Sequence, residues 1–149
     1  MKKVFKALCI CFCTVVLLGG CAKSKEAVFN YKSEGIDIKE TVTYKGNKVE
    51  NEFIVNTLTY DKLTAEELEQ FKVEMIKPYD EYKGIKGMTV KTDVTDTKTI
   101  ITIDIDFKNN LESLIDAGIV EGEDEGVRPD YLAFDNVKSQ LKEEGFVQE

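Results

Sequence analysis

Apolar and polar residues alternate along two long stretches of this chain, and the alternation limits the folds that the chain can adopt. Isoleucine, valine and tyrosine alternate with polar residues over 36–44, and isoleucine and phenylalanine do so over 101–107. A period of two residues is typical of a β-strand with one buried face. The turn sequence of residues 44–48, which contains Gly-Asn, predicts a return strand over 49–60 and therefore a long hairpin.

Helical signals follow each group of strands. Thr64 and Glu67 have the spacing of a capping box, in which each residue satisfies a backbone amide at the helix start. Pro78 is predicted to kink or end that helix, because proline lacks an amide hydrogen and clashes one turn back. Further helices are predicted over residues 109–117 and 129–144, the second with its proline in the first turn and a glycine just after its end.

The predicted order is β-β-β-α-β-β-α-α. The first short strand lies near residues 28–33, and a second hairpin spans 88–107. Strands grouped into hairpins and followed by helices indicate the α+β class: an antiparallel sheet built from hairpins, with helices packed on one face. No linker rich in proline, glycine or serine divides residues 27–149, so we expect one domain there.

Charge and residue types exclude several classes of function. Three of the 20 basic residues and none of the 28 acidic ones lie in the first 20 positions, so residues 21–149 have a net charge of −11. Phosphate backbones repel such a domain, and we expect no nucleic-acid partner. The chain has no histidine, and of its four cysteines only Cys21 lies beyond position 20. We therefore expect no catalytic residues, no cofactor and no metal site of the imidazole or thiolate kind.

The first 20 residues have the organisation of a signal peptide. Lysines at positions 2, 3 and 6 precede a 12-residue apolar run over 7–18. This run is too short to span a hydrocarbon core of about 30 Å, which requires a helix of ~20 residues. Leu18-Gly19-Gly20-Cys21 follows, and this tetrad resembles the lipobox of bacterial lipoproteins.

The lipobox resemblance implies that Cys21 is lipidated and that the chain is cleaved between Gly20 and Cys21. Two acyl chains of the palmitate type would hold the protein stably on the extracytoplasmic face of the cell membrane. Residues 21–26 would then be the lipidated cysteine and a polar tether. Ordinary signal cleavage after Ala22 is the alternative, and it would release a soluble protein.

Acidic side chains are the main candidates for chemistry. Asp104 and Asp106 share one face of a predicted strand, and Asp93 and Asp96 lie in the paired strand and turn. Clustered carboxylates can bind Ca²⁺ or act as an acid/base pair. In a chain with 28 acids, however, a solvated acidic face is the favoured interpretation, and the same holds for the acidic loop of residues 121–126.

One nucleophile motif also occurs. Ser139 and Lys142 match Ser-x-x-Lys, the motif of penicillin-recognising enzymes, but the other elements of those enzymes are missing. The solvated face of the last helix is therefore the favoured interpretation of these two residues.

Two short motifs resemble a known family. Thr-Val-Thr-Tyr-Lys-Gly-Asn-Lys-Val at 41–49 and Glu-Gly-Phe at 144–146, together with the lipobox, resemble the YehR-like lipoproteins. The resemblance implies a small α+β domain and carries over only one functional residue, the lipidated Cys21. That family is functionally uncharacterised, so it implies no activity.

These observations favour a non-enzymatic function. We expect a membrane-anchored binding or interaction module of the cell envelope, which binds an envelope protein or small ligand through its sheet face or a strand edge. One alternative is a carboxylate-dependent envelope hydrolase, which needs two acids in one concave pocket, one of them with a raised pKa. Another is a small-ligand carrier, which needs a sizeable apolar pocket between the sheet and the helices.

Overall fold

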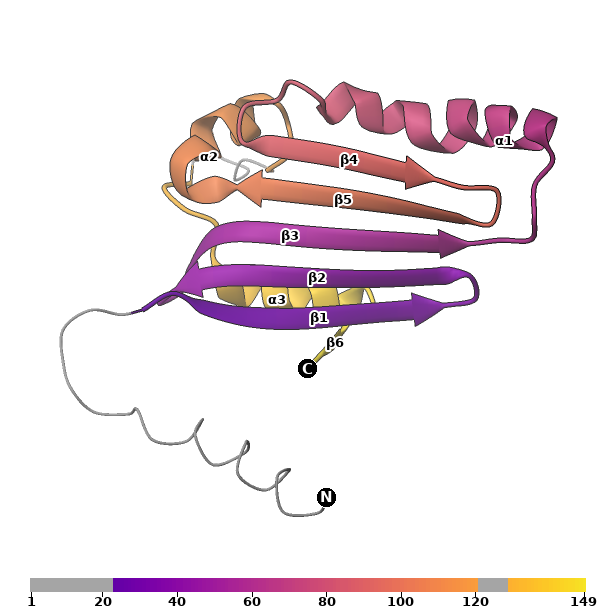
Figure 1. Cartoon of the computed structure of the whole chain (residues 1–149). Helices are drawn as coiled ribbons and strands as arrows, with labels where there is room; N and C mark the ends of the chain where they lie inside the picture. The colour runs from indigo at the N-terminus through magenta and orange to yellow at the C-terminus, as the bar shows by residue number, and fades with distance from the viewer. Residues whose placement is uncertain (1–22, 121–128) are drawn as a thin grey trace, which may run out of the picture.

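A six-stranded antiparallel sheet forms the centre of the computed structural model, which describes residues 23–120 and 129–149. The strand order across the sheet is β4-β5-β3-β2-β1-β6 (Figure 1). The strands are β1 (Lys25–Ser33), β2 (Ile36–Lys45), β3 (Lys48–Thr59), β4 (Met88–Val94), β5 (Lys98–Asp106) and β6 (Val147–Gln148). The helices are α1 (Ala65–Phe71), its continuations η1 (Lys72–Ile76) and η2 (Lys77–Tyr82), α2 (Phe107–Asp116) and α3 (Phe134–Glu143).

The α+β prediction and the β-β-β-α-β-β-α-α order are confirmed, with β6 as an additional short strand at the end of the chain. The predicted turn between the second and third strands is the two-residue loop between Lys45 and Lys48. Gly35 makes the preceding turn at a φ of 72°, and a Cβ atom there would lie 2.8 Å from the carbonyl oxygen of Thr59. That turn therefore requires glycine.

The first helix begins at the predicted capping box and then changes its geometry. The Thr64 hydroxyl accepts the Glu67 amide, and the Glu67 carboxylate accepts the Thr64 amide at 2.8 Å. This backbone hydrogen bond from Thr64 is the main cause that lowers the pKa of Glu67. The α-helix ends at Phe71, then widens into the π-turn η1 and tightens into the 3₁₀-helix η2, which has Pro78 in its first turn. The whole segment runs along the β4 edge of the sheet (Figure 1).

The last helix begins at Phe134, so the prediction that it starts at Pro129 is wrong. The residues just before it are extended, because Ala133 forms a β-bridge with Lys48. Asn47, in the turn between β2 and β3, also caps the helix: its carbonyl Oδ1 accepts the amide of Asp135 at 2.9 Å. A remote turn, rather than the local proline, therefore sets where α3 begins. Gly145 follows α3 at a φ of 94°, as predicted for its end.

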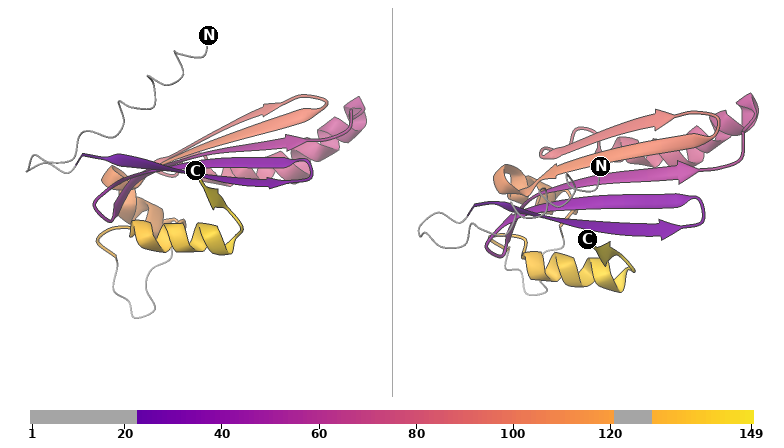
Figure 2. Two further views of the ribbon diagram at one scale, coloured as in Figure 1. Left: turned by 90° about the horizontal axis from the view of Figure 1, so that it is seen from below. Right: turned by 60° about the horizontal axis from the view of Figure 1, so that its bottom comes forward.

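The core lies between one face of the sheet and the helices α2 and α3. Figure 2 shows α3 beneath this face, and none of the helices that the structure describes covers the opposite face. Phe29, Val42 and Leu114 are completely buried there, and Phe134 stacks on Tyr44 with ring centroids 3.8 Å apart. Every described strand, helix and core residue falls within 25–149, so a chain that begins at Lys23 contains the whole described fold.

Candidate functional site

A cavity of about 580 Å³ lies between the inner face of the sheet and the helices α2 and α3. Strands β2, β3 and β5 form its floor, and the ends of α2 and α3 form its walls. Its volume falls within the range of about 300–1,000 Å³ that is usual for small-molecule sites. The polar lining residues are Glu40, Glu52, Gln140 and Glu144, and the apolar ones include Ile105, Phe107, Ile119, Val120, Leu132, Val137 and Leu141.

Glu40 is an acidic residue at a core position. In β2 it lies two residues before Val42 on the same face, and its partner in β1 is the completely buried Phe29. Only 6% of Glu40 is exposed. No residue that the structure describes forms a hydrogen bond or ion pair with its carboxyl group, which borders the cavity. A buried carboxylate without a partner is costly, so this position demands an explanation beyond packing.

Glu52 brings a second carboxyl group to the same cavity. It lies on β3 between the buried Val42 of β2 and the buried Ile105 of β5, and it is itself partly buried. Glu40 and Glu52 are diagonal neighbours across the β2–β3 pair, a placement that puts Cβ atoms about 7–8 Å apart. Within the described chain, Glu52 also lacks a hydrogen bond or ion pair. The sheet register therefore directs both acids into one concave space.

Burial changes the acidity of both groups. Burial, and then the nearby Glu144, raise the pKa of Glu40 from its ordinary value of 4.5 to about 7. Burial, and then Glu40, raise the pKa of Glu52 to about 8. None of the described residues that line the cavity is basic. At neutral pH the carboxyl group of Glu52 is thus largely protonated and that of Glu40 is about half protonated.

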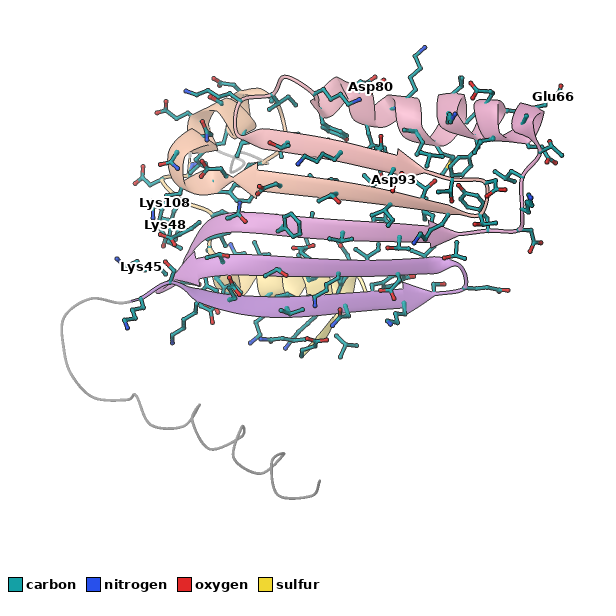
Figure 3. All side chains as sticks on the ribbon, viewed as in Figure 1. Lys45, Lys48, Glu66, Asp80, Asp93 and Lys108 are labelled. Carbon is teal, nitrogen blue, oxygen red and sulfur yellow. The ribbon has the colours of Figure 1, made fainter. Side chains whose placement is uncertain are left out.

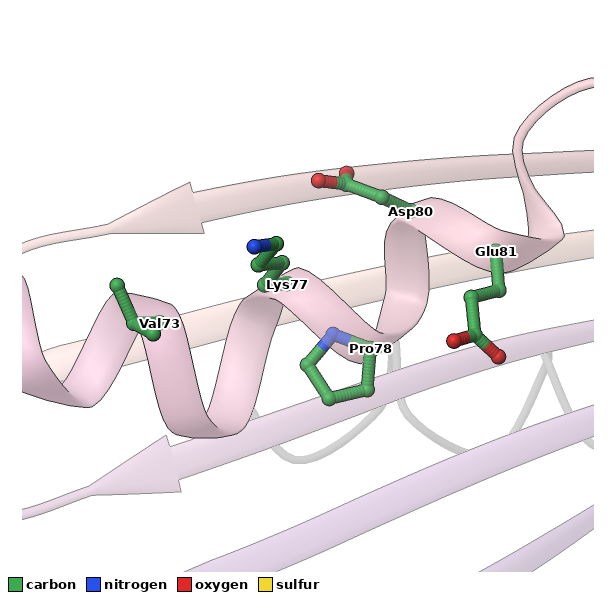
Figure 4. Close-up of a pocket in the computed structure, with 5 residues that line it drawn as sticks. All are labelled: Val73, Lys77, Pro78, Asp80 and Glu81. Atoms are coloured by element: carbon green, nitrogen blue, oxygen red, sulfur yellow. The ribbon is translucent and has the colours of Figure 1, made fainter.

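Other hollows among the described residues have fewer features of a site. One of about 430 Å³ is lined by Val73, Lys77, Pro78, Asp80 and Glu81. Figure 4 shows these residues on a single helical segment, and Asp80 is already paired with Lys83. This hollow is a surface groove of η1 and η2, without a buried polar group directed into it.

The structure separates the four aspartates that the sequence grouped. Asp104 and Asp106 border a small hollow of about 260 Å³, where Asp104 accepts a hydrogen bond from the Asn51 amide at 2.7 Å. Asp106 caps α2 by accepting the Asn109 amide. Asp93 lies at the other end of β4, and Asp96 pairs with Lys62 at 3.4 Å. Residues 23–120 and 129–149 contain no group of three or more acidic or cysteine side chains able to hold a metal ion.

The remaining sequence candidates fall on the surface or outside the described residues. Ser139 and Lys142 are exposed on α3, as expected for a solvated helix face. The signal peptide of residues 1–20, Cys21 and the acidic loop of residues 121–126 lie outside the described residues. No helix among the described residues is long and apolar enough to cross a membrane.

The family follows from residues 25–147, which match the family model described as "Protein of unknown function (DUF1307)". The chain belongs to this family. It is 30% identical over 110 residues to the uncharacterized lipoprotein Lmo0207 of Listeria monocytogenes, a match that covers 72% of each chain. It is 26% identical over 107 residues to the uncharacterized lipoprotein Lin0239 of Listeria innocua, covering 72% of this chain and 70% of the relative.

Two solved structures have a similar fold. The NMR structure of the Escherichia coli YehR protein gives a TM-score of 0.62 at 21% identity, covering 85% of this chain and 91% of that one. An NMR structure of a protein from Streptococcus pneumoniae TIGR4 gives 0.50 at 13% identity, covering 91% and 90%. The predicted resemblance to YehR-like lipoproteins is therefore confirmed, and the printed names of these proteins state no activity.

Neither acid of the cavity was predicted from the sequence, although the sequence pattern around Glu40 indicates an unusual position. In the alternating stretch of residues 36–44, Glu40 occupies the single position where the apolar series is interrupted on its inward face. An acid at an inward position of a strand indicates either an ion pair or a site. Glu52 gave no comparable signal, because apolar residues occur on both faces of β3.

Proposed function

We propose that this DUF1307 protein is a lipid-anchored binding module of the cell envelope and that its binding site is the cavity between sheet and helices. The observation that carries this proposal is the space between sheet and helices that Glu40 borders: this residue is only 6% exposed, and its carboxyl group has no hydrogen-bond or ion-pair partner among the described residues. An isolated buried acid lowers the stability of a fold, and a ligand that completes its interactions would offset that cost. Binding would then occur in the cavity, and not through the sheet face or a strand edge as expected from the sequence.

A carboxylate hydrolase is the second candidate, because two acids with raised pKa values do border one cavity. Glycosidase-type catalysis requires one protonated acid and one carboxylate that stays ionised. Here burial raises the pKa of both Glu40 and Glu52, and none of the lining residues that the structure describes is a cation that would keep either one ionised. The environment does not divide the two acids into an acid and a nucleophile, so we favour binding over catalysis.

Blocking the cavity tests the binding function. We expect a thermal-shift screen of residues 23–149 against lipids, peptides, cell-wall fragments and organic amines to find one class that stabilises the protein. A ligand at about 100 times its Kd adds about 2.7 kcal/mol to the free energy of unfolding. Gln140→Trp, which places an indole ring at the cavity wall, should remove that stabilisation.

Ser139→Trp is the matched control, since Ser139 is exposed on the same helix and does not line the cavity. It should keep the response of the unaltered chain. Stabilisation that persists in Gln140→Trp would place the ligand elsewhere, and the absence of a shift with any class would contradict the proposal.

The anchor is proposed at Cys21. Only three residues separate Cys21 from Lys25, where β1 begins, so at most ~14 Å of chain lies between the lipid and the sheet. Figure 3 shows Lys45, Lys48 and Lys108 at the end of the sheet where β1 begins, while Glu66 lies at the far end. Basic side chains near the anchor favour contact with anionic headgroups. This charge distribution supports an anchor at the N-terminal end.

Mass spectrometry of the N-terminal peptide tests the anchor. We expect the protein from membranes to begin at Cys21 and to carry the mass of a diacylglyceryl group. Cys21→Ala should remove the added mass and lower the membrane-bound fraction. An N-terminus at Lys23, or an unmodified thiol at Cys21, would contradict lipidation and would favour the ordinary signal cleavage described above.

A further inference from the structure

We propose that the cavity takes an organic cation, an ammonium group carried on an apolar body. The inference rests on the proposed binding function and adds the chemical class of the ligand. It is drawn from the placement of three carboxyl groups around one space that also has apolar walls.

The titratable groups among the described residues that border the cavity are all acidic. Glu40 and Glu52 enter from the sheet, whereas Glu144, just after α3, is exposed, borders the same space and accepts a hydrogen bond from the Gln140 side chain at 3.0 Å. The other residues that face Glu40 from the neighbouring elements carry no charge. Its partners in the neighbouring strands are Phe29 and Ile54. The α3 residues that line the cavity are Val137, Gln140 and Leu141. An anionic ligand would be repelled, and a neutral one would leave the carboxyl groups without a charged partner.

An ammonium group satisfies this arrangement. It presents three N–H donors on a compact charge, which can contact two carboxylates at once. Away from bulk water such charge-assisted hydrogen bonds are about twice as strong as neutral ones. The buried Glu40 would then have the partner that the described residues do not provide.

The remaining walls select for an organic ion over an inorganic one. Phe107, Val137 and Leu141 line the same space and are at least nine-tenths buried. A divalent metal ion prefers six or more oxygen ligands, and no described group of three acidic side chains is placed to bind one. A carbon chain or ring attached to the ammonium would cover these apolar walls instead.

Binding should release protons. Because burial raises the pKa of Glu40 and Glu52, a cation that ionises them must displace the protons that they hold. The affinity for the cation should therefore increase as the pH rises from about 6 to about 8. An unrelated surface site would show no such coupling.

Three probes of equal length test the ligand class: hexylammonium, 1-hexanol and hexanoate, titrated calorimetrically into residues 23–149 at about pH 7.5. We expect hexylammonium to bind with a Kd on the order of 1 mM, because a ligand of about seven non-hydrogen atoms buries little surface. The other two probes should bind at least about tenfold more weakly. Proton release should appear as a heat that depends on the ionisation enthalpy of the buffer.

Substitution separates the cavity from non-specific attraction to an acidic protein. Glu40→Gln with Glu52→Gln should reduce hexylammonium affinity by about tenfold or more and abolish proton release. Glu66→Gln, which removes one exposed carboxylate of α1, should change neither. Circular dichroism and a cooperative thermal transition show that each variant is folded.

The outcomes distinguish the two proposals. If hexanol or hexanoate binds as tightly as hexylammonium and Gln140→Trp blocks it, the ligand class is wrong and the binding function stands. If the double variant binds hexylammonium as tightly as the unaltered chain, the cation does not use these acids and the inference is wrong. If none of the three probes binds at about 10 mM, the inference is overturned. The thermal-shift screen of residues 23–149 then tests the binding function separately.

Discussion

Raising the pH from about 5 to about 9 should lower the free energy of unfolding of residues 23–149 by several kcal/mol. In the folded chain the pKa values of Glu40 and Glu52 are about 7 and about 8, whereas both are near 4.5 when the chain is unfolded. Between these values the folded state binds more protons than the unfolded state, so stability decreases with pH. One pKa unit corresponds to about 1.4 kcal/mol, which gives a loss on the order of 3 kcal/mol for each group.

Few other groups contribute in this range of pH. The chain has no histidine. The pKa values of Glu50 and Glu67 are lowered, mainly by hydrogen bonds from Ser24 and from the Thr64 backbone respectively. Their contribution has the opposite sign: it is present above the unfolded pKa and is lost as the pH falls below it. The decrease above pH 6 therefore reports on the cavity.

Urea denaturation at a series of pH values measures this effect. Glu40→Gln with Glu52→Gln should flatten the curve and make the protein more stable than the unaltered chain above about pH 8. The two losses interact and will not simply add. Glu66→Gln should keep the original slope. An unaltered chain that is equally stable at pH 5 and pH 9 would contradict the burial of uncompensated carboxyl groups.

Phe29→Ala should lower the free energy of unfolding by about 3–5 kcal/mol. Phe29 is completely buried and packs within the cluster of Ala27, Val42 and Leu141. Removing a buried ring loses its transfer free energy and leaves a cavity that the fold fills only in part. For a domain of this size, whose total stability is about 5–15 kcal/mol, this loss is a large share.

Phe53→Ala is the matched control. Phe53 lies on the open face of β3, where 40% of it is exposed, so we expect a loss of about 1 kcal/mol. Urea denaturation of both variants measures the difference, with an unchanged m-value as evidence that the unfolded state is the same. If Phe53→Ala cost as much as Phe29→Ala, the helices would not be covering the face that carries Phe29.

The fold could be predicted where local chemistry decides it. The capping box at Thr64 and Glu67 and the two-residue turn at Gly46 are satisfied within a few residues, so their patterns were sufficient. The inward face of β3 could not be predicted in the same way. Phe53 on one face and Ile54 on the other are both apolar, and only the register with β2 and β5 shows which of them faces the helices.

Features that depend on distant residues were missed. The start of α3 is set by Asn47, which lies 88 positions before the amide that it caps. The short strand β6 exists because Val147 and Gln148 pair with the edge of β1. Glu40 and Glu52 become a site only when β2, β3 and α3 enclose one space. An acid at a core position can be noticed in a sequence, but its lack of a partner can be seen only in the folded chain.

Carbon-13 NMR of the glutamate carboxyl carbons tests the cavity most directly. In residues 23–149, two signals, identified by their loss in Glu40→Gln and in Glu52→Gln, should titrate with pKa values of about 7 and about 8. Saturation with hexylammonium should lower both. Two signals that titrate near the ordinary value of 4.5 and do not respond to hexylammonium would show that the cavity neither shields these acids nor binds a cation.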